Sequence, residues 1–491
     1  MFDLSIFFGS FLRIFTSNTS YTHTMKRNNT SNEQNIKSLV FEYEAMSQQG
    51  TVGFYEKTAF LQLIDHYLNK ELYDHALEVI DHAINQHPFS GSFHIVQAQL
   101  YIENNSETLA LEALDKAILY ATSIFEVQIL RAEALRSLGS FSEAFQILDD
   151  LLINANLEQR SEIYLSKALI YESKKHYNDM FTALKNSVLA NPENSDSLER
   201  VWFSVEMTQQ YDESIKFHQE LIDIDPYSYI SWYNLGYAFS AKGDHKNARD
   251  AFEYAFIIND KFEFAFREYA ESCIQLNEYE QALKSYDELL EHFDPDADLL
   301  MKIGMCHQAL DSYEKAKSFF IKAINLDENN DEIYYHLGTC LLKKGNYDSA
   351  KKAFNKAIFL DDLKEEYYIG LAEVYFQTNE LDLAKGFYQK ATEVAPETST
   401  CWLQLARFLM NIGKKDIAMN VLDEAELYSF GTELTFGKIA ILFTLKKRKE
   451  ALTLLKKALA ENFEKHNFLF KMTPDLKDDK DVQHLISSFT S

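Results

Sequence analysis

Small and apolar side chains recur along most of this chain at a fixed interval of 34 residues. Gly236, Gly304 and Gly338 occupy one such column, which continues through Ala372 and Ala406. A constant interval of this length is typical of a repeat architecture, in which one small structural unit recurs many times. The pattern therefore predicts one tandem array rather than the several separate domains that a length of 491 residues alone would suggest.

Each unit combines two apolar faces that have helical spacing. Trp232, Leu235, Gly236 and Phe239 fall at positions i, i+3, i+4 and i+7, which lie on one face of a helix. A second face follows after a short polar turn, and glycine or alanine is expected where the two helices approach too closely for a larger side chain. The further members of the repeat signature are Ala248, Phe252, Ala316, Ala350, Ala384 and Ala418.

Residues that end helices stand between these faces. Glycine or asparagine in turns such as KGDHKNA and LNEYEQA suits the left-handed residue that ends a helix, and Asp, Ser or Asn suits the next N-cap. Twelve units result, with a two-residue insertion within 151–160 and a one-residue deletion before Ala451. Five of the six prolines fall where the second helix of a unit must stop. They are Pro88, Pro192, Pro226, Pro295 and Pro396.

The pattern W-x-x-L-G-x-x-[YF], followed by A-x-x-x-F and a proline near the joint, resembles the tetratricopeptide repeat in a bacterial-type multi-repeat solenoid. The resemblance implies an all-α fold, a right-handed α-solenoid (superhelix) of about twelve tandem helix-turn-helix repeats, with the first helices lining a concave groove. We expect the repeats over 57–466. Because the ends of a solenoid need covering, we expect an N-terminal capping helix within 25–56 and a C-terminal capping helix within 467–491.

Residues 1–24 differ from the rest of the chain. Their apolar stretch is interrupted by Arg13 and is too short to span a bilayer, and Asp3 stands where a signal peptide carries basic residues. We predict a mis-assigned start, with Met25 as the true initiator of a cytoplasmic protein. The alternative is a degenerate export signal or anchor.

One part of the array departs from the pattern. Trp202 stands in the column of small residues, and His218 of the same unit stands where other units have an aromatic ring. Residues 151–228 are therefore expected to be the least regular segment. Either side chains repack locally, or a kink or hinge divides the solenoid here.

The acidic composition excludes several classes of partner. The 75 acidic residues outnumber the 48 basic ones, so the formal net charge is −27, which repels nucleic acid and anionic membrane surfaces. The 14 histidines lack metal-ligand spacing, no C-x-x-C occurs, and Cys306 and Cys340, one period apart, are expected to be small core residues. Nucleotide-binding and hydrolase motifs are absent, so we expect no metal, no cofactor and no enzyme activity.

One basic cluster interrupts this acidic chain. Residues 445–457 read LKKRKEALTLLKK. Such a run usually forms a turn and a solvated helix face, and the alternative is a docking patch for an acidic partner. The sequence leaves both interpretations open.

Two columns on the predicted first helices carry residue types that are enriched at binding hot spots. They lie away from the packing face, so we predict a groove patch that takes an extended or helical peptide. Its residues are Phe203, Tyr233, Tyr237, Arg267, Glu271, Met301, Met305 and Tyr335. The predicted function is a non-enzymatic scaffold or adaptor that binds protein or peptide partners. The alternative is a peptide-responsive regulatory sensor whose superhelical pitch changes when a ligand binds.

Overall fold

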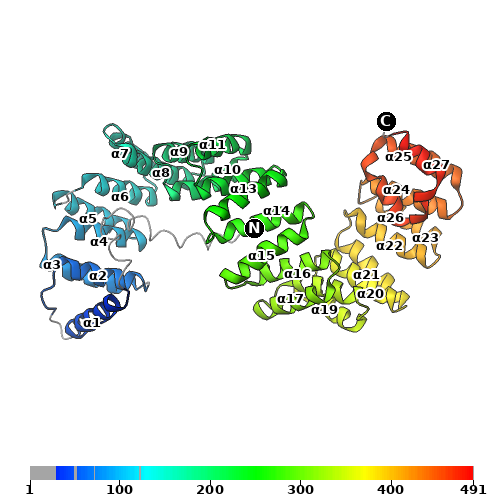
Figure 1. Ribbon diagram of the computed structural model, residues 1–491, viewed down its shortest axis with the longest axis horizontal. Coiled ribbons are helices and arrows are strands. Elements are labelled where there is room, and N and C mark those ends of the chain that lie inside the picture. The colour runs from blue at the N-terminus through cyan, green and yellow to red at the C-terminus, as the bar shows by residue number, and fades with distance from the viewer. Residues whose placement is uncertain (1–28, 49–51, 71, 121–122, 490–491) are drawn as a thin grey trace. The chain divides into compact units, whose positions relative to one another are not determined.

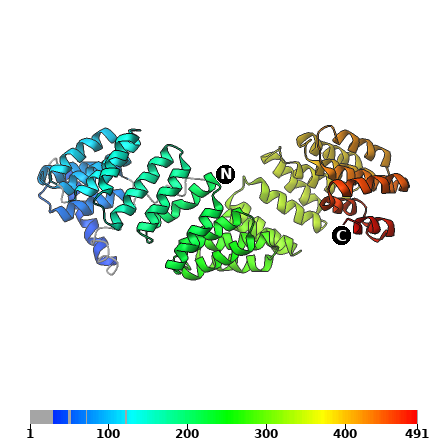
Figure 2. The same ribbon diagram turned by 90° about the horizontal axis from the view of Figure 1, so that it is seen from above.

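Every regular element that the structure describes is a helix, which confirms the predicted all-α class (Figures 1 and 2). The computed structural model describes residues 29–48, 52–70, 72–120 and 123–489. The chain divides into two compact units, one up to Ala265 and one from Phe266 onward. Residues 1–24, for which the sequence predicts a mis-assigned start, lie outside the described residues.

The first unit is a series of helix pairs that follow one another along the chain, with consecutive helices side by side (Figure 1). Its helices are α1 (Asn29–Ser47), α2 (Lys57–Leu68), α3 (Tyr73–Gln86), α4 (Gly91–Glu103), α5 (Glu107–Tyr120), α6 (Ile124–Ser137), α7 (Phe141–Leu152), α8 (Leu157–Ser173), α9 (Tyr177–Ala190), α10 (Ser195–Thr208), α11 (Tyr211–Ile224), α12 (Tyr229–Ala241) and α13 (His245–Ile258). The next helix, α14 (Glu263–Gln275), contains the division between the units.

The second unit continues the same alternation. Its helices are α15 (Tyr279–His292), α16 (Ala297–Ala309), α17 (Tyr313–Leu326), α18 (Asp331–Lys343), α19 (Tyr347–Leu360), α20 (Glu365–Gln377), α21 (Leu381–Val394), α22 (Ser399–Asn411), α23 (Lys415–Ala425), α24 (Thr432–Thr444), α25 (Arg448–Glu461), α26 (Asn467–Met472) and α27 (Lys480–Ser487), with 3₁₀ turns at Phe463–His466 and Pro474–Asp478. From α2 to α25 the described residues form the twelve predicted hairpins, in which even-numbered helices come first.

The turns within the hairpins keep the period of the sequence. A residue with positive φ follows the first helix of most hairpins, at 34-residue steps from Gln209 (φ 56°) to Gly413 (φ 79°). Between Gly139 and Lys175 the step is 36 residues, which reflects the two-residue insertion, and α8 is extended to 17 residues. The step of 33 residues from Gly413 to Lys446 reflects the predicted deletion. The five prolines lie between hairpins, as predicted.

The column of small residues lies where the two helices of a hairpin approach most closely. A Cβ atom at Gly236 would lie 2.7 Å from Cε1 of Phe252, and one at Gly304 would lie 2.5 Å from Cε1 of Phe320. Contacts this short are not tolerated by real side chains, so the predicted reason for these glycines is confirmed. The alanines of the repeat signature are fully buried: Ala248, Ala316, Ala350, Ala372, Ala384, Ala406 and Ala418.

The aromatic residue that opens the repeat signature has a role beyond packing. The indole N–H of Trp232 donates a hydrogen bond to the carbonyl of Pro226 at 2.9 Å, and Trp402, five periods later, donates to the carbonyl of Pro396 at 2.8 Å. At the same position Tyr368 donates its hydroxyl to a carbonyl six residues earlier, at 3.1 Å. These side chains therefore tie the start of a first helix to the joint before it.

The hairpin of α10 and α11 is repacked around Trp202. Helix α10 lies mainly against α9 and α12 and only marginally against its own partner α11. The Trp202 ring lies edge-on to Phe203 and Tyr237, with ring centroids 5.9 Å and 5.8 Å away. His218 is fully buried, and neither of its ring nitrogens has a hydrogen-bond partner among the described residues. The indole is too large for the close approach, so this hairpin loses the regular contact.

Short segments lie against the first and last hairpins. Val40 and Tyr43 of α1 pack in one core cluster with Phe60 of α2. At the other end, Val482 and Ile486 of α27 pack with residues of α24 and α25. We propose that α1 and the segment from α26 to α27 cap the array, because an uncovered end would expose an apolar face.

Gly236→Leu should destabilise the protein by about 1–3 kcal/mol, because the larger side chain collides with Phe252. Denaturant unfolding of the full chain, followed by circular dichroism, measures this loss. Gly386→Leu is the matched control, since a Cβ atom at Gly386 meets nothing within 4 Å. Equal losses in the two variants would contradict the close approach.

His218→Phe should stabilise the protein, and more so at low pH. Burial lowers the pKa of His218 from 6.5 to about 3, so between these values the unfolded chain binds a proton that the folded chain does not. The stability of the wild type therefore falls as the pH drops through this window, with a limiting slope of about 1.4 kcal/mol per pH unit. Phenylalanine removes this proton linkage and both unpaired nitrogens.

Unfolding curves between pH 7 and pH 4 test this prediction. The stability difference between His218→Phe and wild type should widen as the pH falls. His292→Phe, at an exposed position of α15, is the control for the removal of a histidine side chain. A pH-independent gap for His218→Phe would show that His218 is readily protonated in the folded protein.

Candidate protein-binding surface

An aromatic row lies on the first helices α10 and α12 and on the start of the second helix α9. It consists of Tyr177, Trp202, Phe203 and Tyr237, which meet edge to face. The Phe203 and Tyr177 rings, for example, are perpendicular, with centroids 5.7 Å apart. All four side chains are partly exposed. Flat aromatic area of this kind binds peptides at little cost in conformational entropy.

A carboxylate lies beside the aromatic row. One oxygen of the exposed Glu206 accepts hydrogen bonds from the hydroxyl groups of Tyr237, at 2.8 Å, and Tyr211, at 3.1 Å. Partial burial and the hydrogen bond to Glu206 raise the pKa of Tyr211, so its hydroxyl group keeps the proton that it donates. The row therefore combines apolar area with a fixed hydrogen-bond acceptor.

Tyr233 differs from its neighbour Tyr237, although both belong to the predicted groove patch. Its ring contacts Phe252 and Phe262, with centroids 5.5 Å and 5.0 Å away. Phe252 belongs to the second helix of the same hairpin. Tyr233 therefore contributes to hairpin packing.

In the second unit, the charged residues of the predicted patch bridge to the next hairpin. Arg267 donates to Asp296 at 2.8 Å, and Glu271 accepts from Lys302 at 2.7 Å. Burial lowers the pKa of Lys302, but its hydrogen bond to Glu271 and the nearby negative charges raise it more. Both members of the predicted Arg267 and Glu271 pair thus have partners in α16 or at its N-cap.

Two residues of the predicted patch are more enclosed than the sequence suggested. Met301 is only 6% exposed and lies in a core cluster with Phe320 and Ile333, so its side chain contributes mainly to packing. Helix α16 buries both Leu300 and Met301, so the column of first-helix residues that contains Met301 is not exposed in this hairpin. Tyr335 is half-buried, and burial raises its pKa.

Met305 lines an open pocket of about 290 Å³, to which helices α14 to α18 of the second unit contribute side chains. Tyr279 and Tyr313 stand at the starts of α15 and α17 and line its sides. Among the described residues, no hydrogen-bond partner is present for the amide oxygen of Gln308 or for Nδ1 of His336. The volume of this pocket is slightly below the range of about 300–1,000 Å³ that is usual for small-molecule sites, and it has room for a single side chain.

The tyrosines of this pocket are not part of the predicted groove patch, although the sequence carries a signal for them. Tyr177, Tyr211, Tyr279, Tyr313 and Tyr347 lie at multiples of 34 residues from one another, once the insertion is passed. Each is the first residue of a second helix. This column, taken together with the first-helix columns, would have indicated the pocket.

No candidate for catalytic or metal chemistry emerges from the cysteines. All four are buried, and burial raises the pKa of Cys306 to about 12, so its thiol stays protonated. Cys306 and Cys340 are small core residues, as predicted. Within the described residues, no group of three or more His, Cys, Asp or Glu side chains is arranged to hold a metal ion. None of the helices in that part of the chain combines the length and apolar character needed to cross a membrane.

Comparison with known proteins identifies the repeats. Models of the tetratricopeptide repeat match residues 332–362 and, in a second set, residues 229–256, 297–330 and 365–398. Each matched stretch coincides with one hairpin of the structure. A search of curated protein sequences found no match.

Solved structures with similar helix arrangements include three proteins of low sequence identity. One is the Cut9–Hcn1 hetero-tetramer of the APC/C, with 12% identity, a TM-score of 0.39 and 94% coverage of each chain. A tetratricopeptide repeat protein from Parabacteroides merdae has 15% identity and a TM-score of 0.39, over 51% of this chain and 99% of its own. TTC0263 from Thermus thermophilus has 23% identity and a TM-score of 0.32, over 37% of this chain and 100% of its own.

The matched repeats and the twelve hairpins define the class of protein. This chain is a multi-repeat tetratricopeptide protein. Proteins of this class are helical scaffolds for protein–protein interaction and are typically not enzymes. They bind protein or peptide partners.

Proposed function

We propose that this protein is a non-enzymatic scaffold that binds segments of partner proteins along its first helices. The observation that carries the proposal is the Met305 pocket, which lies on a column that the repeat pattern places away from the packing face. The aromatic row of the first unit adds a second contact area of similar chemistry.

The pocket at Met305 fits one apolar side chain of an extended or helical peptide. Its lining of Met305, Tyr279 and Tyr313 supplies apolar contact, and methionine adapts readily to side chains of different shape.

The double variant Met305→Ala, Tyr313→Ala should weaken partner binding by about 2 kcal/mol or more, which corresponds to a roughly 30-fold higher Kd. Partners are first identified by affinity capture on the full chain and mass spectrometry, and their Kd values are then measured with purified components. Both side chains are partly exposed, so the melting temperature should stay close to that of the wild type.

Ile321→Ala is the matched control, since this residue is an exposed position on α17 outside the pocket. It should bind every partner with wild-type affinity. If the double variant stays folded and also binds every partner unchanged, partners do not use the Met305 pocket. Tyr233→Ala is expected to lower the melting temperature instead, because Tyr233 packs on Phe252.

A further inference from the structure

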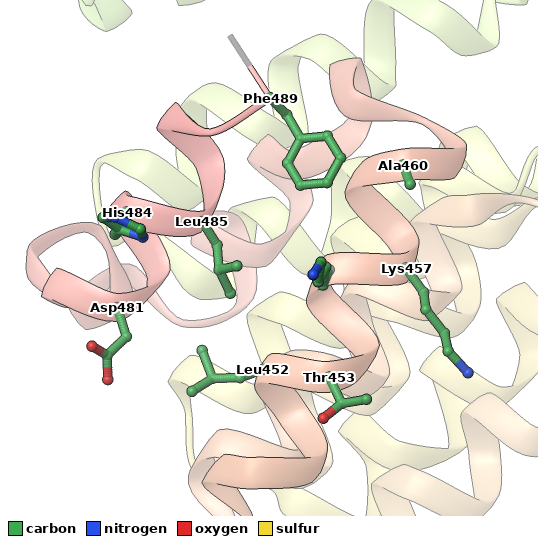
Figure 3. Close-up of a pocket in the computed structure, with 9 residues that line it drawn as sticks. Leu452, Thr453, Lys457, Ala460, Asp481, His484, Leu485 and Phe489 are labelled. Carbon is green, nitrogen blue, oxygen red and sulfur yellow. The ribbon is translucent and has the colours of Figure 1, made fainter. Parts of the chain in front are cut away.

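A second pocket, of about 650 Å³, lies at the C-terminal end of the second unit, between α25 and α27 (Figure 3). It shares no residue with the Met305 pocket. The repeat pattern does not predict it, because α27 follows the last hairpin. Its volume is in the range of about 300–1,000 Å³ that is usual for ligand sites.

The walls of this C-terminal pocket are two helix faces held in place by the core behind them. Thr453, Lys456, Lys457 and Ala460 of α25 fall at i, i+3, i+4 and i+7, so they share one face. The opposite wall comes from α27 and the residues that follow it. The remaining faces of the two helices are buried with α24 and α26 in one core cluster, which fixes the walls.

The base of the pocket is apolar. Leu452 projects from α25, while Leu485 and Phe489 project from the side of α27 into the space between the helices (Figure 3). All three side chains are partly exposed rather than buried. A bulky apolar side chain of a partner would cover this surface and remove it from water.

The rim of the pocket is positively charged in a protein whose net charge is −27. Lys456 and Lys457 are exposed, and in the part of the chain that the structure describes no carboxylate lies within ion-pairing distance of either. The one carboxylate of the lining, Asp481, is paired with Arg448 at 2.7 Å. The rim therefore offers two cations to an incoming anion and no unpaired negative charge.

We propose that the C-terminal pocket binds an acidic segment of a partner protein. One bulky apolar side chain of that segment inserts between Leu452, Leu485 and Phe489, and flanking carboxylates pair with Lys456 and Lys457. This assigns the last two lysines of the basic run 445–457 to docking, one of the two interpretations that the sequence left open. A second copy of this chain is disfavoured as an occupant, because both copies carry the net charge of −27. Nucleic acid and anionic membranes extend well beyond the pocket and meet the rest of the acidic surface, whereas a short acidic segment lies mainly within one Debye length (about 8 Å) of the two lysines.

Fluorescence anisotropy with a defined probe tests the proposal on the full chain. The probe is a fluorescein-labelled peptide amide, DEELFDELLEE, and its neutral counterpart is NQQLFNQLLQQ. The acidic peptide should bind at least tenfold more tightly than the neutral one, and its affinity should fall as the salt concentration rises. Equal affinity of the two peptides would overturn the proposal.

Variants locate the binding. The double variant Lys456→Glu, Lys457→Glu and the single variant Leu485→Asp should each weaken binding of the acidic peptide at least tenfold. Lys284→Glu, Lys315→Glu changes the net charge by the same amount at exposed positions of α15 and α17, and it should bind as the wild type does. Equal weakening by the two lysine pairs would show a long-range charge effect and would overturn the proposed site.

Two further measurements distinguish this pocket from the Met305 pocket and from a face that binds lipid or a second copy of the chain. The Met305→Ala, Tyr313→Ala variant should bind the acidic peptide with wild-type affinity. The proposal for the Met305 pocket and the proposal for the C-terminal pocket can therefore be overturned independently of each other. Phosphatidylserine-containing vesicles should not compete with the peptide, and the chain should not self-associate through this face in light scattering. Vesicle competition, or a dimer that Lys456→Glu, Lys457→Glu abolishes, would overturn the assignment to a partner protein.

Discussion

The close approach of the two helices in each hairpin is the contact on which the rest of this structure depends. A Cβ atom at Gly236 would lie 2.7 Å from the ring of Phe252 in the second helix, so the residue at position 236 must be small. The contact sets the spacing of the pair and buries the ring. The opposite face of the first helix takes no part in this contact.

Neighbouring hairpins are also joined by ion pairs between corresponding helices. Lys185 pairs with Glu213 in the first unit, and Lys302 pairs with Glu271 in the second, at 2.6 Å and 2.7 Å. Partly exposed ion pairs of this kind contribute about 0–1 kcal/mol each, so the apolar stacking must supply most of the stability. The hydrogen bonds from Trp232 and Trp402 to the joints instead fix where these two hairpins begin.

The exception at Trp202 shows what happens when the close approach is lost. The indole cannot occupy a place built for glycine or alanine, so α10 moves its contacts to α9 and α12. His218 is left fully buried without a hydrogen-bond partner among the described residues, which is an energetic cost. In return, the Trp202 ring joins the aromatic row, which we propose as a contact area for partners.

The sequence alone determined the features that are local or periodic. The positions of twelve hairpins, the small-residue column, the proline joints and the insertion near 151–160 all follow from chain spacing, because each hairpin repeats the same short-range contacts. The sequence also explains the glycine column. Glycine within a helix costs about 1 kcal/mol relative to alanine, so its recurrence at one position of the repeat indicates a close neighbour that leaves no room for a larger side chain.

Only the tertiary structure decided how deep each side chain lies and which partner it meets. The columns correctly indicate a shared helix face, but Met301 on that face is 6% exposed, whereas Met305, four residues on, lines a pocket. Arg267 and Glu271 could pair within their own helix, yet both reach residues of the next hairpin. The C-terminal pocket forms where α27 packs beside α25, outside the repeat. How deeply a side chain is buried, and which residue it contacts, depend on the size of the side chains that neighbouring helices bring to it. The spacing of residues along one helix does not specify those neighbours.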